Sequence, residues 1–381
     1  MLGYILMMHV TRAEEDILAG ESGAVKQKAM EILVALGDIY NAESLIPIES
    51  AQIAGVSYKT IGEPGLEYLS HLSGNVVVPT MLNPMGMDRY AWRQMGIDET
   101  FVERQLAIIR RYEMLGIDAQ CTCTPYYINA PRAGAHLSWA ESSAVSYANS
   151  VLGARTNREG GPSALAAALV GKTPDYGYHR DENRIPDISV KVDFPLTGTG
   201  FGALGYVVGK LVKSQVPQFS FVAPPNADEL KALGAAMAAS GSVALFFTNE
   251  HTKPRETLEL DRSDIDIYSS LEPDLVVLGC PHCSRSELAE IARLLERRTV
   301  KRPLWICTSR FVADRSSSVI ARIKASGAHV ICDTCMIVSP AFEKRSMMVN
   351  SGKALEYGPS LCNSHTLMGT TADCITAACT A

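Results

Sequence analysis

The sequence predicts an α/β fold with mainly parallel sheets, and a pattern near the C-terminus carries that prediction. Short apolar runs at Asp274–Cys280 (DLVVLGC), Pro303–Ser309 (PLWICTS) and His329–Cys335 (HVICDTC) have the composition of buried strands. Two segments of helix length lie between them, at Ser284–Arg298 and Arg310–Ser326. Strands that alternate with helices in this way form βαβ units and parallel sheets.

Cysteines gather where these predicted strands end. Open parallel sheets bind their ligands outside the carboxyl ends of the strands. In this part of the chain those ends carry Cys280, Cys283, Cys307, Cys332 and Cys335. We therefore expect the thiols to lie at the edge of a sheet where chemistry is usually done.

Earlier segments continue the same alternation. Periodicity and turn signals predict, in chain order, helices at Ala13–Leu18 and Ala24–Tyr40, strands at Leu45–Ser57 and Val76–Asn83, a helix at Asp98–Leu115, a strand at Ile117–Pro125 ending in Cys121 and Cys123, and a helix at Ser138–Leu152.

The remaining elements follow a polar stretch, residues 160–187, which we take as the best boundary between regions 8–185 and 186–381. They are a strand at Ile188–Pro195, a helix at Asp228–Ser240, a buried strand at Val243–Thr248, a polar surface segment at Arg255–Ser270, a strand at Ser346–Asn350 and a helix at Thr370–Ala381 that contains Cys374.

Composition restricts the function classes. The chain has 381 residues, enough for two or three lobes, with 47% hydrophobic residues, 20% charged residues and a net charge of −6. The negative balance argues against nucleic-acid binding. No apolar run has the length of a membrane span, and the N-terminus lacks a basic region and a cleavage site. We expect a cytoplasmic protein with free thiols, and read Met8 as a possible start.

The cysteines allow several readings. Cys280-x-x-Cys283 and Cys332-x-x-Cys335 have the form of zinc-binding pairs, but residues 284–331 between them are too many for a zinc ribbon. A redox pair and simple apolar packing are further alternatives. Iron–sulfur ligation accounts for the pattern better, because thiolates from separate strands hold such clusters.

For that cluster we select Cys123, Cys280 and Cys335, since each ends a predicted strand, with Cys362 and Cys374 in reserve. Three thiolates would hold a [4Fe-4S] cluster and leave one iron open. An open iron is a Lewis acid that binds a substrate hydroxyl and helps it leave as water.

Polar turns predict a site for a small anionic substrate. Gly55, Val56 and Ser57 end one predicted strand, and Asn83 and Pro84 end another. Lys353, in an Asn-Ser-Gly-Lys turn, adds a cation, so together these groups suit a carboxylate or phosphate, although each alone is more often just a turn.

Two further features are ambiguous. Gly200, Gly202 and Gly205 match the dinucleotide-binding pattern GxGxxG, but no suitable strand and acidic residue follow, which favours close helix packing instead. His282, beside the cysteines, either orients a substrate or is a satisfied histidine at the edge of the sheet.

From Met8 onward the sequence resembles the large, catalytic subunit of the aconitase X family. The motifs that carry the resemblance are GVSY (55–58), LNPMGMD (82–88), CTPY (123–126), WAESSAVSYANSVLGART (139–156), GCPH (279–282), DTC (333–335), NSGKA (350–354) and ADC (372–374).

This resemblance implies an iron–sulfur hydro-lyase with aconitase-like stacked α/β lobes. We expect the small swivelling domain of the family to be a separate subunit, which forms a heterodimer with this chain. The resemblance leads us to expect the catalytic base from that small subunit. Two-subunit archaeal members dehydrate (R)-5-phosphomevalonate to trans-anhydromevalonate 5-phosphate in an isoprenoid pathway; bacterial members with the domain fused dehydrate cis-3-hydroxy-L-proline. A non-catalytic zinc-binding module is a hypothesis of a different class.

Overall fold

The first lobe is built on a parallel sheet in the order β4-β3-β2-β5, as seen in the computed structural model, which describes residues 8–380. The prediction of Met8 as a possible start concerns residues 1–7, which lie outside this range. The strands are β2 (Ser50–Ile53), β3 (Thr80–Leu82), β4 (Asp118–Cys121) and β5 (Leu137–Trp139), and β1 (Leu45–Pro47) pairs antiparallel with β6 (Lys172–Pro174). The helices are α1 (Arg12–Leu18), α2 (Ala24–Ile39), α3 (Tyr58–Ser70), α4 (Glu99–Met114), α5 (Ser142–Ser150) and α6 (Gly161–Val170), with short 3-10 turns at Pro125–Tyr127, Gly177–His179 and Asp181–Asn183.

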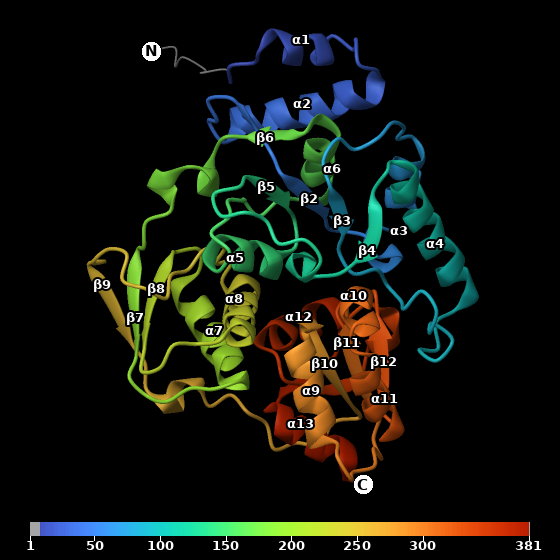
Figure 1. The fold of residues 1–381 in the computed structure, drawn as a ribbon, viewed down its shortest axis with the longest axis vertical. Helices are drawn as coiled ribbons and strands as arrows, with labels where there is room; N and C mark the ends of the chain where they lie inside the picture. Colours follow the sequence, from blue (N-terminus) through green and yellow to red (C-terminus); the bar gives the residue numbers. More distant parts are fainter. Residues whose placement is uncertain (1–7, 381) are drawn as a thin grey trace.

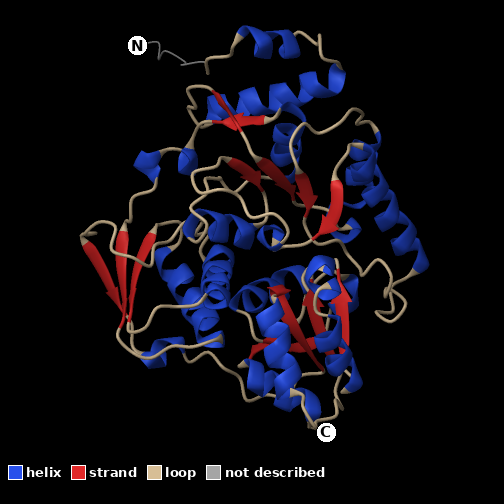
Figure 2. Cartoon of the chain, in the orientation of Figure 1, coloured by secondary structure: helices blue, strands red, loops and turns tan. Residues whose placement is uncertain are grey.

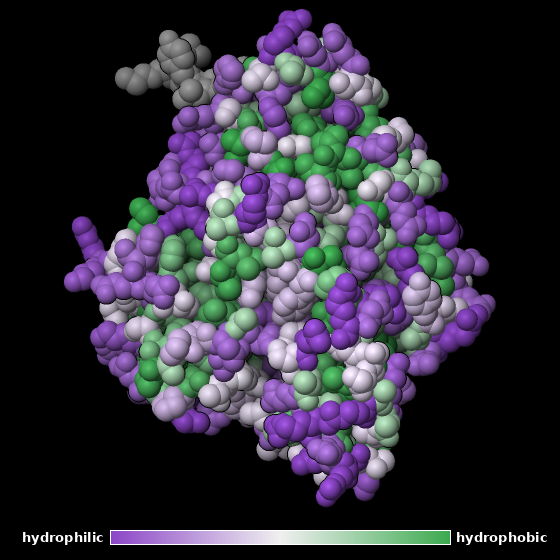
Figure 3. All heavy atoms as spheres, in the orientation of Figure 1, coloured by the Kyte–Doolittle hydropathy of each residue, from purple (hydrophilic) through white to green (hydrophobic). Residues whose placement is uncertain are grey.

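The middle lobe, at the left of Figure 1, has a small parallel sheet in the order β8-β7-β9. Its elements are β7 (Ile188–Val192), α7 (Thr199–Val212), β8 (Pro217–Phe221), α8 (Ala227–Ser240), β9 (Glu256–Glu259) and a 3-10 turn at Arg262–Ile265. The edge strand β9 is largely exposed, and hydrophilic side chains cover that margin of the molecule in Figure 3.

The third lobe contains a parallel sheet in the order β12-β11-β10-β13-β14. Its elements are β10 (Leu275–Cys283), α9 (Arg285–Leu294), β11 (Leu304–Thr308), α10 (Arg310–Asp314), α11 (Ser317–Ala325), β12 (His329–Cys332), a 3-10 turn at Pro340–Phe342, β13 (Ser346–Val349), α12 (Gly352–Cys362), β14 (His365–Met368) and α13 (Thr371–Cys379). Every residue of β10 is buried, as expected for a central strand covered by helices on both faces.

The sheets of the first and third lobes meet at their carboxyl ends. In Figures 1 and 2 the arrowheads of β3 and β4 and those of β10 and β12 point toward the same region between the lobes. Two contacts join the loops there: the Ser57 hydroxyl donates to the Val338 carbonyl over 2.8 Å, and the Met85 N–H donates to the Asp333 carbonyl over 2.8 Å. The molecule therefore brings together the two edges at which parallel sheets bind ligands.

Local capping signals place several helices where the sequence predicted them. Asp98 accepts the N–H of Thr100 at 2.8 Å at the start of α4, and Ser284 and Glu287 bond reciprocally at the start of α9. The α/β class and the mainly parallel sheets are confirmed by these elements.

Other local predictions were wrong in part. The segment Val243–Thr248 is buried over residues 243–246 but forms no strand: it makes a single parallel bridge, between Phe247 and Gln218. The helix predicted over 138–152 is instead β5 followed by α5, and the segment 310–326 contains two helices, α10 and α11. Cys362, expected on a loop, ends α12.

The stretch 160–187 begins with α6, whose residues Ser163–Leu169 are buried. The polarity of that stretch therefore does not mark a loop along its whole length. The division into 8–185 and 186–381 stays a prediction. Within residues 8–380, no helix is long and apolar enough to cross a membrane.

The GxGxxG pattern lies inside α7 and serves close packing on α8, as the sequence favoured. A Cβ on Gly205 would lie 2.4 Å from the Leu233 carbonyl oxygen, which is below any tolerated contact. A Cβ on Gly202 would lie 3.5 Å from the Gly352 nitrogen, an ordinary van der Waals distance. The two glycines therefore differ in what they tolerate.

We predict that Gly205→Ala lowers the free energy of unfolding by about 1–3 kcal/mol, because the added methyl group forces α7 away from α8. The matched control Gly202→Ala has room for its methyl group and gains helix propensity, so its stability should be equal or higher by up to about 1 kcal/mol. Urea unfolding of both variants measures the difference. Equal stabilities would contradict the close packing of α7 on α8.

Candidate active site

The three selected cysteines lie where the two sheet edges meet. Cys123 follows β4 by two residues, Cys280 lies in β10, and Cys335 follows β12 by three residues. All three side chains are buried, and all ten cysteines of the chain are free thiols. The fold thus brings sulfurs from distant parts of the sequence to one region.

The pKa values of these thiols show that they share one environment. Burial raises the pKa of Cys123, Glu141 and Cys335 raise it further, and Lys353 acts in the opposite sense. Burial also raises the pKa of Cys280, against which Lys353 again acts. The Cys335 pKa is raised by burial and held back by the backbone N–H groups of Ile337 and Val338. The same ammonium group therefore lies within electrostatic reach of these sulfurs.

The reserve cysteines lie in different places. The Cys362 thiol donates to the Met336 carbonyl at 3.2 Å, next to Cys335, and burial raises its pKa to about 11. Cys374, on α13, packs instead in an apolar cluster with Leu367 and Ile375. Cys280, Cys335 and Cys362 belong to another cluster, so Cys374 is separated from them.

The donor set, three buried thiols, is of the kind that holds iron–sulfur clusters. Among residues 8–380, no three His, Cys, Asp or Glu side chains are close enough to hold one metal ion. A cluster is larger than an ion and is bound by thiolates that stand further apart. Buried polar atoms without hydrogen-bond partners also adjoin the thiols in sequence or space: Gln52 Oε1, Asn83 Oδ1, Tyr126 Oη and Thr334 Oγ1. Soft donors surrounded by unsatisfied polar atoms fit a group that the chain itself does not supply.

The first predicted substrate turn connects the two lobes. Gly55 has φ +76°, a left-handed conformation that favours glycine. The Val56 carbonyl accepts from the Gln105 amide at 3.0 Å, and Ser57 begins α3. Because the Ser57 hydroxyl already donates to Val338, this turn is fixed against the loop that follows Cys335.

The second predicted turn lies beside it. The Asn83 N–H donates to the Ile53 carbonyl at 2.9 Å, which aligns the end of β3 with the end of β2. The buried Asn83 carboxamide oxygen has no partner, and Pro84 is buried after it. Asn83 therefore has an acceptor available at the sheet edge.

Lys353 forms a buried ion pair that sequence reasoning missed. Its ammonium group bonds the Glu141 carboxylate, and Glu141 also accepts from the Ser143 hydroxyl at 2.5 Å and the Ala144 N–H at 2.7 Å. Burial alone would raise the pKa of Glu141, but Lys353 and these donors hold it below its ordinary value. The pKa of Lys353 is raised because Glu141 and the nearby thiols outweigh its burial.

A signal for Glu141 existed in the sequence. The residue follows β5 by two positions and caps α5, so it too lies near the carboxyl end of a strand. Reading 138–152 as one helix placed it on a helical face instead. Recognising the strand Leu137–Trp139 would have added Glu141 to the predicted site.

His282 does not face an open cavity. It is completely buried, and burial lowers its pKa to about 4, against the effect of its bond to the Thr334 carbonyl. Its backbone N–H donates to Cys123 Sγ at 3.1 Å. The interpretation as a satisfied histidine fits better than direct contact with a substrate.

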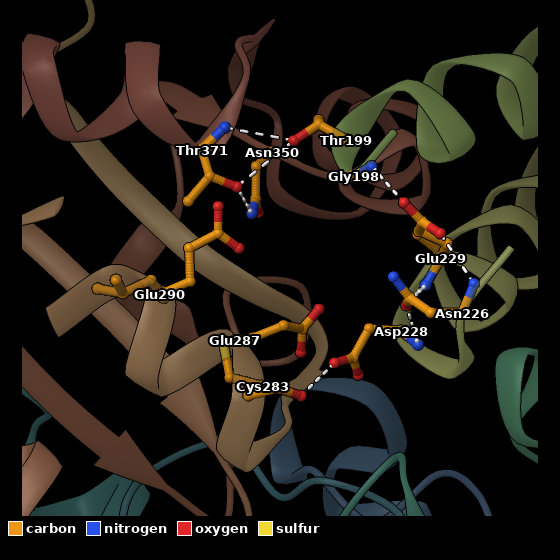
Figure 4. A pocket seen from close by; sticks show the side chains of 13 residues that line it. Gly198, Thr199, Asn226, Asp228, Glu229, Cys283, Glu287, Glu290, Asn350 and Thr371 are labelled. Carbon is orange, nitrogen blue, oxygen red and sulfur yellow. Dashed lines mark hydrogen bonds between the residues drawn. The ribbon is translucent and has the colours of Figure 1, made fainter. Parts of the chain in front are cut away.

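An acidic pocket of about 210 Å³ lies beside the cysteines, between α8 and α9. Figure 4 shows Asp228, Glu287 and Glu290 directed toward its interior, with Cys283 at one side. A smaller cleft of about 30 Å³, lined in part by Cys280 and Cys283, adjoins it. Because carboxylates repel anions, this pocket does not match the anionic ligand predicted from the turns.

Comparison with known proteins identifies the family. Models of the first, second and third domains of aconitase X match residues 7–182, 186–270 and 273–380. The chain belongs to the aconitase X family. It is also similar to the crystal structure of Thermococcus kodakaraensis aconitase X in its holo-form, with a TM-score of 0.89 and 43% identity, covering 97% of this chain and 100% of that one.

Relatives within the aconitase X family carry two names. The phosphomevalonate dehydratase large subunit of Methanosarcina mazei is 52% identical, covering 97% of this chain and 96% of that protein. The protein of that name from Thermococcus kodakarensis is 46% identical, over 92% and 95% of the two chains. The cis-3-hydroxy-L-proline dehydratase of Pseudomonas aeruginosa is 34% identical, over 96% of this chain but 69% of that protein. The family and the aconitase-like fold predicted from the sequence are confirmed.

We predict that Lys353→Met lowers the free energy of unfolding at pH 7 by about 3–5 kcal/mol, because it leaves the Glu141 carboxylate buried without a counter-charge. In the wild-type protein the lowered pKa of Glu141 contributes stability above its ordinary value of 4.5, and this is lost as the pH falls through the folded value. In the variant, burial raises that pKa, so the deficit should shrink between pH 7 and pH 5 as Glu141 binds a proton.

Urea unfolding at the two pH values measures this change. The double variant Glu141→Gln with Lys353→Met removes both charges and should recover part of the loss at pH 7. A deficit that is independent of pH, or a double variant no more stable than Lys353→Met alone, would contradict the buried ion pair.

Proposed function

We propose that this chain is the large subunit of an iron–sulfur hydro-lyase that converts (R)-5-phosphomevalonate to trans-anhydromevalonate 5-phosphate. The observation that carries the proposal is the similarity to phosphomevalonate dehydratase large subunits, at 52% identity over nearly the full length of both chains in one case. Buried thiols at the meeting of two parallel sheet edges support it. Fold alone would not carry it, because one fold hosts many activities.

Cys123, Cys280 and Cys335 are the proposed ligands of a [4Fe-4S] cluster. When bound, such a cluster supplies a Lewis-acidic iron for the hydroxyl group that leaves from C3 of the substrate. The protein contributes a desolvated environment, since all three thiols and the neighbouring Lys353–Glu141 pair are buried. Metal binding deprotonates such thiols, which burial otherwise keeps protonated.

The chain's remaining groups would bind and orient the substrate. We place the substrate against the two turns formed by Gly55, Val56 and Ser57 and by Asn83 and Pro84. Lys353, whose ammonium group is paired with Glu141, would lie near an anionic group of the substrate, and the unpartnered Asn83 carboxamide oxygen would accept from a substrate hydroxyl. Loss of the C2 proton with the C3 hydroxyl then yields the alkene and water.

We propose that the base for the C2 proton comes from a partner. The relatives are named large subunits, which implies a small subunit, and we identify it with the swivelling domain. A heterodimer would close the site over the substrate and exclude water. The free thiols of the chain suit the reducing cytoplasm, where we place the complex.

A second candidate substrate is cis-3-hydroxy-L-proline, because relatives 34% and 31% identical bear the name of its dehydratase. We predict that the complex of this chain with its small subunit, purified without oxygen, dehydrates phosphomevalonate and leaves the hydroxyproline unchanged. Mass spectrometry distinguishes the two candidate substrates, because the one that is dehydrated loses the mass of one water molecule, about 18 Da. Omitting the small subunit or chelating the iron should abolish turnover, and dehydration of hydroxyproline alone would reassign the substrate.

We predict that Cys123→Ala, Cys280→Ala and Cys335→Ala each retain less than about a tenth of the wild-type iron, since loss of a ligand costs at least as much affinity as loss of a supporting residue. Cys374→Ala is the matched control: it is equally buried but lies in another core, and should keep its iron. Iron analysis and visible absorbance measure this, and a colourless zinc protein would overturn the cluster. Loss of iron in Cys374→Ala but not in Cys280→Ala would exchange these two ligands.

A further inference from the structure

His282 is bonded to each of the segments that carry the proposed cluster ligands. It lies in β10, two residues after Cys280, and its backbone N–H donates to the Cys123 sulfur at 3.1 Å. Its ring contacts Thr122, which lies between Cys121 and Cys123, and Thr334, which directly precedes Cys335. This placement connects the edge of the first sheet to that of the third lobe.

The ring nitrogens have distinct partners. Nε2 lies 2.9 Å from the Thr334 carbonyl oxygen. Because a carbonyl oxygen only accepts, Nε2 carries a hydrogen and donates it. Nδ1 lies 3.2 Å from Thr122 Oγ1, and in the neutral ring it accepts the hydrogen of that hydroxyl group.

The threonine end of this connection is itself held in place. Thr122 Oγ1 accepts the Thr124 N–H at 3.0 Å and lies 3.0 Å from Thr124 Oγ1. The Thr122 carbonyl in turn accepts from the Gln52 amide at 2.8 Å, and its N–H donates to the Leu82 carbonyl at 2.9 Å. The hydroxyl that meets His282 is therefore attached to a rigid sheet edge.

A buried histidine needs partners for both nitrogens, and many arrangements would supply them. Here the ring joins Thr122, one residue before Cys123, to Thr334, one residue before Cys335, and it stands two residues after Cys280. The residue therefore contacts the segments of Cys123 and Cys335 directly and belongs to the strand of Cys280. This connection adds to the contacts Ser57–Val338 and Met85–Asp333 between the lobes, and it acts on the residues next to two of the sulfurs.

We propose that His282 is a positioning residue that fixes the mutual placement of Cys123, Cys280 and Cys335, with Thr122 as its anchor on the first lobe. The inference rests on the proposed function for the identity of the bound group, a cluster built from ferrous iron and sulfide. Residues that orient metal ligands typically contribute 10–100-fold to metal affinity.

The test is anaerobic reconstitution of the full chain with ferrous iron and sulfide, followed by visible absorbance and iron analysis. Thr122→Val removes the anchor hydroxyl, and His282→Gln keeps a donor for Thr334 but moves the side-chain acceptor, now the carboxamide oxygen, away from the position of Nδ1 beside Thr122. Each should raise the iron concentration for half-maximal reconstitution about tenfold or more. The double variant should be no worse than the poorer single one, because both changes break the same bond.

Three controls separate positioning from folding. Thr122→Ser restores the hydroxyl and should recover wild-type affinity. His329→Gln changes a half-buried histidine at the far end of β12, stacked on Trp305, and should leave affinity unchanged. All measurements are made well below the unfolding temperature of each iron-free variant, so that an unfolded fraction does not mimic weak binding.

The possible results distinguish this inference from the proposed function. Wild-type affinity in both Thr122→Val and His282→Gln overturns the positioning role, whatever the enzyme does. Weakened iron binding in those variants, together with a wild-type complex that does not dehydrate phosphomevalonate, upholds the positioning role and refutes the proposed substrate. A wild-type chain that takes up no iron overturns both.

Discussion

Two parallel sheets meet at their carboxyl ends, and the groups at that junction must satisfy one another without water. Charged groups there are paired: the buried Lys353 with Glu141, and the partly exposed Arg310 with the buried carboxylates of Asp333 and, at 3.0 Å, of Asp88. Because an unpaired charge in such surroundings is strongly destabilising, these pairs join the first lobe to the third. The placement of every candidate site residue depends on this junction.

The same desolvation governs the chemistry of the thiols. Burial keeps Cys123, Cys280 and Cys335 protonated, and a single ammonium group nearby acts only partly against it. A positively charged metal centre would reverse that balance and convert the thiols to thiolates. A site of this kind is poor at general nucleophilic chemistry and well suited to holding a cluster away from solvent.

The fold alone does not determine which substrate a member of this family uses. The scaffold that brings the sheet edges together is similar in aconitase X of Thermococcus kodakaraensis, at a TM-score of 0.89. Relatives with different substrate names match the same chain. The substrate therefore does not follow from the scaffold alone.

The sequence by itself determined the elements whose signals are local. Asp98 and the Ser284–Glu287 pair predict the starts of two helices, because they have the pattern of helix caps. The run before Cys280 predicts a buried strand, because its apolar residues are continuous. Local signals failed at Leu137–Trp139, where three residues are too few to show a period, and at Val243–Thr248, where burial in the middle lobe came with a single bridge and no strand.

Only the tertiary structure decided which strand ends meet. Glu141 and Lys353 are 212 residues apart in sequence, and Thr122 and His282 are 160 apart. No pattern within a few residues encodes such a contact, because it depends on how complete lobes pack and on which buried groups must find partners there.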